Sequence, residues 1–109
     1  MIDDEPVIQS LVRRALTRSG FDVLTADTGS QAIHLFSEHH RHIAAVLVDQ
    51  NLPDINGLDL IAQLRHLRSD VRIVLCSGQL HSYSQLPEEV DAMLRKPFAL
   101  NDLLDAVTI

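Results

Sequence analysis

The sequence contains short apolar runs, each followed by a polar residue at the point where it ends. The clearest runs occupy residues 43–48, 71–76 and 93–94, and a shorter one, Met1-Ile2, opens the chain. Runs of this length are typical of strands that are buried on both faces of a parallel sheet. Between them, apolar residues recur at helical spacing. Strands that alternate with helices predict an α/β fold, a doubly wound parallel sheet with helices on both faces. With 109 residues, we expect a single domain spanning residues 1–109.

Helix boundaries are indicated by proline, glycine and turn residues. Pro6 is tolerated in a first helical turn, and Gly20 fits a helix stop. The expected helices begin at 5–6, after the turn 27–30, after Gly57 and at Leu100, and the expected strands are 21–25, 43–48, 71–76 and 91–94. Residues 79–90 contain Ser82, Ser84 and Pro87, which favour a short or irregular segment over a full helix.

The first predicted strand is unusually short. Only Met1 and Ile2 precede the acidic pair, whereas most of the other strands offer four to six residues. If this strand is central, the loss of about four buried aliphatic side chains forfeits roughly 6–12 kcal/mol. That amount rivals the total stability of a typical domain, about 5–15 kcal/mol. We therefore interpret the first strand as truncated: either the chain is a fragment of a longer protein, or its N-terminus is assigned too late.

The polar residues at the strand ends are expected to meet in one cleft, because the carboxyl ends of parallel strands share an edge of the sheet. These residues are Asp3, Asp4, Asp49, Ser77 and Lys96. Three clustered carboxylates repel one another unless a cation binds, and Mg²⁺ prefers carboxylates, waters and phosphate oxygens. A carboxylate in such a site can attack phosphorus, and an ammonium can offset developing charge. Each residue alone could be a cap, a turn or a solvated lysine, but together they predict a magnesium-dependent phosphoryl site.

Charge and hydropathy exclude several classes of protein. The formal net charge is −6 and the basic residues are scattered, whereas a nucleic-acid surface needs clustered Lys and Arg. The longest apolar run is about six residues, far too short to span a bilayer, and the first residues do not form a secretory signal. The only cysteine, Cys76, fits a reducing compartment. We expect a cytoplasmic domain without direct nucleic-acid binding or membrane contact.

The whole chain resembles the receiver domain of two-component response regulators. The resemblance is carried by Asp3-Asp4-Glu5-Pro6, by Val48-Asp49-Gln50-Asn51-Leu52-Pro53-Asp54-Ile55-Asn56-Gly57, by Ser77-Gly78 and by Lys96-Pro97-Phe98. It implies a flavodoxin-like sheet of five strands in the order 2-1-3-4-5, with the first strand central. The Ser77-Gly78 pair and the Leu52-Pro53 loop also resemble receivers attached to hybrid sensor histidine kinases.

The resemblance implies a role for each residue of the predicted site. Asp49 would accept the phosphoryl group, with Asp4, Asp49 and the Asn51 backbone carbonyl as Mg²⁺ ligands, Asp3 acting through water, Ser77 as the switch hydroxyl and Lys96 contacting the phosphate. The donor would be a sensor histidine kinase or a histidine phosphotransfer domain. The domain would catalyse its own phosphorylation and a slow dephosphorylation. Its output would lie in an unknown partner or flanking domain.

Departures from the family pattern leave alternatives open. Met93 occupies the position three residues before the lysine, where the family usually has Tyr or Phe, so we expect a muted or different conformational change. Met93 and the irregular segment 79–90 favour a pseudo-receiver, an interaction module that works without phosphorylation; the complete acidic set argues against it. A phosphatase or mutase with an aspartate nucleophile would need a second Asp two residues later, where this chain has Asn51.

Overall fold

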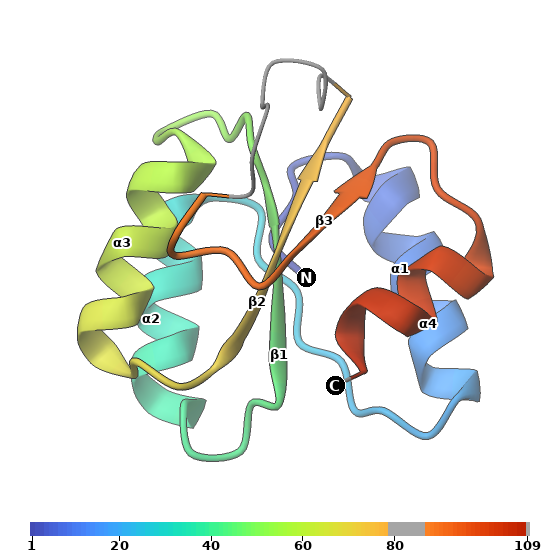
Figure 1. The fold of residues 1–109 in the computed structure, drawn as a ribbon, viewed down its shortest axis with the longest axis horizontal. Coiled ribbons are helices and arrows are strands. Elements are labelled where there is room, and N and C mark those ends of the chain that lie inside the picture. Colours follow the sequence, from blue (N-terminus) through green and yellow to red (C-terminus); the bar gives the residue numbers. More distant parts are fainter. Residues whose placement is uncertain (79–86, 109) are drawn as a thin grey trace.

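The computed structural model describes residues 1–78 and 87–108, and it contains four helices and three strands in that part of the chain (Figure 1). The elements are α1 (Pro6–Arg18), α2 (Gly29–His39), β1 (Ala45–Asp49), α3 (Gly57–Leu67), β2 (Arg72–Ser77), β3 (Ala92–Arg95) and α4 (Leu100–Val107). The predicted α/β class is confirmed. Most of the segment predicted to be irregular, residues 79–86, lies outside the described residues.

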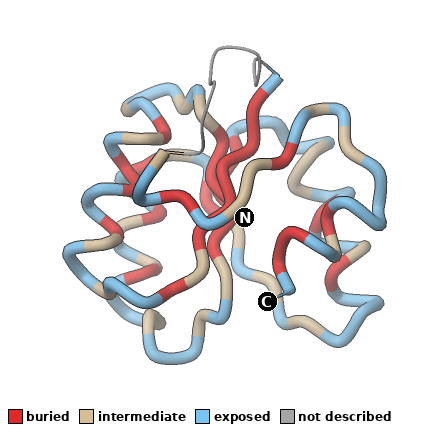
Figure 2. Tube along the Cα trace, viewed as in Figure 1, coloured by how far each residue is buried: buried red, intermediate tan, exposed pale blue. Residues whose placement is uncertain are grey.

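The three strands form a parallel sheet in the order β1-β2-β3. Helices α2 and α3 cover one face of this sheet, and α1 and α4 cover the other (Figure 1). Successive residues of a strand point to opposite faces, so β2 contributes Ile73 and Leu75 to the core beneath α2 and α3, and Val74 and Cys76 to the core beneath α1 and α4. Burial on both faces explains why β1 and β2 are apolar almost throughout; Figure 2 shows the buried strands at the centre of the molecule.

The prediction of a strand over residues 21–25 is wrong. Among the described residues, β-pairing on this side of the sheet is limited to single parallel bridges that Ile2 makes with Ala26 and Val48. The Ile2 amide donates to the Leu47 carbonyl at 2.8 Å, and the Asp3 amide donates to the Ala26 carbonyl at 3.1 Å. Met1 and Ile2 are too few to pair with residues 21–25 along their length, and a ladder of one bridge does not make a strand. The expected order is therefore present only as three strands plus these bridges.

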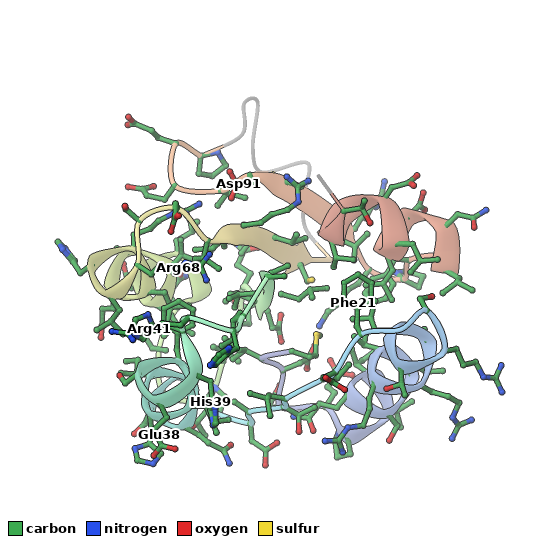
Figure 3. The ribbon with its side chains drawn as sticks, turned by 90° about the horizontal axis from the view of Figure 1, so that it is seen from below. Phe21, Glu38, His39, Arg41, Arg68 and Asp91 are labelled. Carbon is green, nitrogen blue, oxygen red and sulfur yellow. The ribbon has the colours of Figure 1, made fainter. Side chains whose placement is uncertain are left out.

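A cavity of about 410 Å³ lies between residues 21–26 and β1, and its lining includes Phe21, Leu35, His39 and Leu47. Figure 3 views the molecule from the edge at which the strands begin, with Phe21 and His39 labelled. The cavity is lined by the start of β1, Ala45–Leu47, but not by Asp49, so it is separate from the edge at which the strands end.

Local signals set most helix ends where the sequence predicts them. Pro6 opens α1, and Gly20 follows its end with φ +94°, a conformation that side chains rarely adopt. The Thr28 hydroxyl caps α2 by accepting a hydrogen bond from the Gln31 amide, and the Asn56 side chain caps α3 by accepting one from the Leu58 amide. Within the described residues, no helix is long and apolar enough to cross a membrane.

Candidate functional site

The predicted polar residues do lie at the carboxyl edge of the sheet. Asp49 and Ser77 are the last residues of β1 and β2, Lys96 directly follows β3, and Asp3 and Asp4 follow the bridged residue Ile2. Backbone hydrogen bonds fix their relative positions: the Asp49 amide donates to the Ile2 carbonyl at 2.9 Å, and the Lys96 amide donates to the Ser77 carbonyl at 2.9 Å. The edge is therefore assembled by the sheet itself.

Asp3, Asp4 and Asp49 form the acidic centre of this edge. Each can place a carboxylate oxygen within 4.8 Å of an oxygen of the other two. Asp3 is fully buried and Asp49 is 6% exposed, whereas Asp4 is exposed. Burial and the charge of Asp3 raise the pKa of Asp49 above its ordinary value, although Lys96 opposes this effect. The cluster thus carries uncompensated negative charge, the condition under which a bound cation is most favourable.

Lys96 extends its ammonium into the acidic cluster. Its Nζ lies 2.6 Å from Asp3 Oδ2, 3.4 Å from Asp49 Oδ1 and 4.0 Å from Glu5 Oε1. Burial disfavours the charged ammonium, but the hydrogen bond with Asp3 and the charges of Asp3 and Asp49 outweigh it, so the pKa of Lys96 is raised. The lysine is therefore a permanent cation at physiological pH. The peptide bond between Lys96 and Pro97 is cis.

Asp3 also anchors the start of α1. Its second carboxylate oxygen, Oδ1, accepts a hydrogen bond of 2.9 Å from the Glu5 amide. The carboxamide of Gln9, in the first turn of α1, donates to the Asp3 carbonyl and to Asp27 Oδ1 at 2.7 Å. Sequence reasoning missed Gln9, because a glutamine on a helix with other polar residues gives no signal of which backbone carbonyl its side chain reaches.

The loop after β1 is held close to the acidic cluster. The Asn51 amide donates to Asp49 Oδ1 at 3.3 Å, which places the backbone of Asn51 beside the cluster. The Gly57 amide donates to the Gln50 carbonyl at 2.7 Å, and a Cβ on Gly57 would lie 2.4 Å from the Asp49 carbonyl oxygen. Only glycine permits this approach, so the start of α3 packs directly on the residue that ends β1.

Asp54 ties the same loop to α2. Its carboxylate accepts hydrogen bonds from the Gly29 amide at 2.8 Å and the Ser30 amide at 3.0 Å. These bonds lower the pKa of Asp54, as expected for a carboxylate at the positive end of a helix.

The Ser77 hydroxyl has a partner that the sequence analysis did not anticipate. Ser77 Oγ donates to Oε1 of Gln50, the residue that follows Asp49. Ser77 is 1% exposed, so its hydroxyl lies inside the edge rather than on its surface. A hint was present in the sequence, since Gln50 is polar and directly follows a buried strand, but spacing alone could not pair it with Ser77.

The donor set fits a hard divalent cation. The three carboxylates are grouped at one point, and that of Asp4 is exposed. Carboxylate oxygens are ligands that Mg²⁺ takes together with water and phosphate. The lysine beside them matches a group that neutralises a phosphoryl oxygen. The edge therefore offers a cation site at the Asp49 carboxylate, with the positive charge of Lys96 beside it.

Comparison with known proteins agrees with this geometry. Residues 1–108 match the family model described as the response regulator receiver domain. The chain is 35% identical over 106 residues to the transcriptional regulatory protein KdpE of Mycobacterium tuberculosis, a match that covers 95% of this chain and 46% of KdpE. The chain therefore spans less than half of that relative.

Two solved structures show the same fold. A response regulator receiver domain protein from Clostridium thermocellum matches with a TM-score of 0.89 and 27% identity, over 97% of this chain and 86% of the other. The response regulator protein TrrA from Thermotoga maritima, in complex with Mg²⁺ and BeF, matches with a TM-score of 0.87 and 29% identity, over 97% and 91%.

Proposed function

Because the chain belongs to the response regulator receiver domain family, we propose that it accepts a phosphoryl group on Asp49 from the phosphohistidine of a partner. The observation that carries this proposal is the grouping of Asp3, Asp4 and Asp49 around the ammonium of Lys96. This grouping at one edge of the sheet supports Asp49 as the nucleophile, the carboxylates as a cation site and Lys96 as a fixed positive charge.

The transfer that we propose exchanges one bond for another. A carboxylate oxygen of Asp49 attacks the phosphorus, an O–P bond forms, and the N–P bond to the donor's imidazole breaks. Lys96 lies within reach of Asp49 and would contact the oxygens of the incoming phosphoryl group. The nucleophile must be ionised, and its raised pKa makes the carboxylate more basic than an ordinary aspartate.

Mg²⁺ would be held by Asp4, Asp49 and the Asn51 backbone carbonyl, with Asp3 acting through water. Both carboxylate oxygens of Asp3 already accept hydrogen bonds, from Lys96 and from the Glu5 amide, which supports an indirect role. When bound, the ion would supply positive charge that balances the carboxylates and the phosphoryl oxygens. The relative TrrA was solved with Mg²⁺ and BeF, which supports the same chemistry here.

Ser77 would be the hydroxyl that turns to the phosphoryl group, and Met93 would stand in for the usual aromatic switch. Met93 is partly buried against the core beneath α2 and α3. A flexible thioether in that place supports a smaller change on phosphorylation than an aromatic ring would give.

The remaining expectations stay predictions. They are a cytoplasmic location, the kinase or phosphotransfer partner and the attachment to a hybrid sensor kinase.

Intact-mass analysis after incubation with acetyl phosphate tests the proposal. We expect a gain of one phosphoryl group that requires Mg²⁺ and is absent in Asp49→Asn. Asp54→Asn, at an aspartate outside the acidic centre, is the matched control and should retain the gain. No gain in the folded wild-type domain would reject the proposal and favour the pseudo-receiver.

A further inference from the structure

The hydrogen bond between Ser77 and Gln50 joins the ends of two neighbouring strands. Ser77 Oγ is the donor and the Gln50 side-chain oxygen is the acceptor. Ser77 is buried and Gln50 is half-buried, so water competes little for either end of the bond. A hydroxyl has one proton to donate, so it cannot donate to Gln50 and to a phosphoryl oxygen at the same time.

The backbone of Gln50 is held by two hydrogen bonds. Its amide donates to the Cys76 carbonyl at 2.9 Å, and its carbonyl accepts from the Gly57 amide at 2.7 Å. The Ser77 backbone is fixed in turn by the hydrogen bond from the Lys96 amide to its carbonyl. Because both backbones are held by the sheet and by α3, the two side chains meet in a defined geometry. Release of the hydroxyl then requires rotation of the Ser77 side chain rather than movement of the strands.

We propose that Gln50 is a positioning residue that holds the Ser77 hydroxyl in the resting state and thereby opposes its rotation toward a phosphoryl group on Asp49. This inference rests on the proposed function, because the competing acceptor is the phosphoryl group. A hydrogen bond between two neutral groups is weaker than one to a charged oxygen, so phosphorylation still turns the hydroxyl. The hydrogen bond to Gln50 reduces the free energy gained when the Ser77 hydroxyl exchanges Gln50 for a phosphoryl oxygen.

Gln50→Met tests the role, because methionine keeps the length of the side chain and removes the acceptor. The probe is beryllofluoride with Mg²⁺, which mimics the phosphoryl group, and its dissociation constant is measured by calorimetry. Loss of one neutral hydrogen bond from the resting state should tighten binding roughly 2- to 10-fold. The matched control is Gln63→Met on the exposed surface of α3, which should leave binding unchanged.

The same substitution in a Ser77→Ala background separates positioning from packing. Without the hydroxyl, its hydrogen bond to Gln50 is already absent, so Gln50→Met should no longer tighten binding. An equal change in both backgrounds, or no tightening in the wild-type background, would overturn the inference. If Gln50→Met does not fold, as judged by its amide spectrum, Gln50→Ala replaces it in the same cycle.

Wild-type binding separates failure of this inference from failure of the proposed function. If the wild-type domain binds beryllofluoride and gains a phosphoryl group, an unchanged affinity in Gln50→Met rejects only the role of Gln50. If the wild-type domain does neither, the proposed function fails, and the role of Gln50 fails with it.

Discussion

Lys96 and Asp3 are 93 positions apart in the sequence, yet Lys96 Nζ lies 2.6 Å from Asp3 Oδ2. The lysine is farther from Asp49, at 3.4 Å, so its closest carboxylate is the fully buried Asp3. The ammonium therefore has two tasks in the resting protein. It neutralises a buried carboxylate, and it places positive charge beside the residue that we propose as the phosphoryl acceptor.

Removal of this ammonium should destabilise the domain. Lys96→Met leaves the Asp3 carboxylate buried beside Asp49 without a counterion, and breaking a buried ion pair in this way costs about 3–5 kcal/mol. Urea unfolding measures the loss, and Arg95→Met, at an exposed neighbour, should cost little. Asp3→Asn should restore most of the stability of Lys96→Met, because the amide carries no charge. A loss below about 1 kcal/mol in Lys96→Met would show that the pair is not coupled.

Asp49→Asn should stabilise the domain in the absence of divalent cations. The folded-state pKa of Asp49 is raised above 3.8, so the folded state favours the protonated carboxyl. The stabilisation from this protonated form is present below pH 3.8 and is lost as the pH rises through the folded-state pKa. The advantage of Asp49→Asn over wild type should thus be small at pH 3 and largest near pH 7. A gain of about 1 kcal/mol would raise the melting temperature by about 4–8 °C. Equal melting temperatures at pH 7 in the presence of EDTA would contradict this prediction.

Gly57→Ala should disturb the site through the backbone. The added Cβ would lie 2.4 Å from the Asp49 carbonyl oxygen and 2.8 Å from Gln50 Cα, and neither backbone atom can move without shifting the end of β1. We expect a loss of about 1–3 kcal/mol in stability. Gly78→Ala is the control, since a Cβ there meets nothing within 4 Å. Similar thermal stability of the two variants would argue against close packing between α3 and β1.

Cys76 should be inert toward thiol reagents. Burial raises the pKa of its thiol to about 12, so almost none of it is thiolate at pH 8. Ellman's reagent should label the native domain slowly, and label it fully in guanidinium chloride. Rapid labelling of the folded protein would show that this part of β2 opens readily.

The sequence predicts most of the site because the site is built from strand ends. Buried strands need apolar residues on both faces, so Asp49, Ser77 and Lys96 mark the ends of their runs, and parallel pairing brings those ends together. The helix ends can also be predicted from local sequence, since Gly20 and Asn56 act through local hydrogen bonds and backbone conformation.

The wrong strand prediction and the contacts that were not predicted have a different origin. The predicted strand at 21–25 fails because pairing is a property of two segments, and Met1-Ile2 offers too few residues for a ladder. The contact of Ser77 with Gln50 depends on side-chain rotamers at the ends of two strands. The hydrogen bond from Gln9 to the Asp3 carbonyl depends on how α1 lies on the sheet. Such contacts follow from packing in three dimensions, which a periodic pattern does not encode.

The most direct test of the account is to locate the phosphoryl group. Borohydride reduces an aspartyl phosphate to homoserine, so the domain is incubated with acetyl phosphate and Mg²⁺, reduced, digested and sequenced by mass spectrometry. We predict homoserine at position 49 and unmodified aspartate at Asp3 and Asp4. Homoserine at Asp3 or Asp4, or its absence from a domain that has gained the mass of a phosphoryl group, would contradict the assignment of Asp49 as the acceptor.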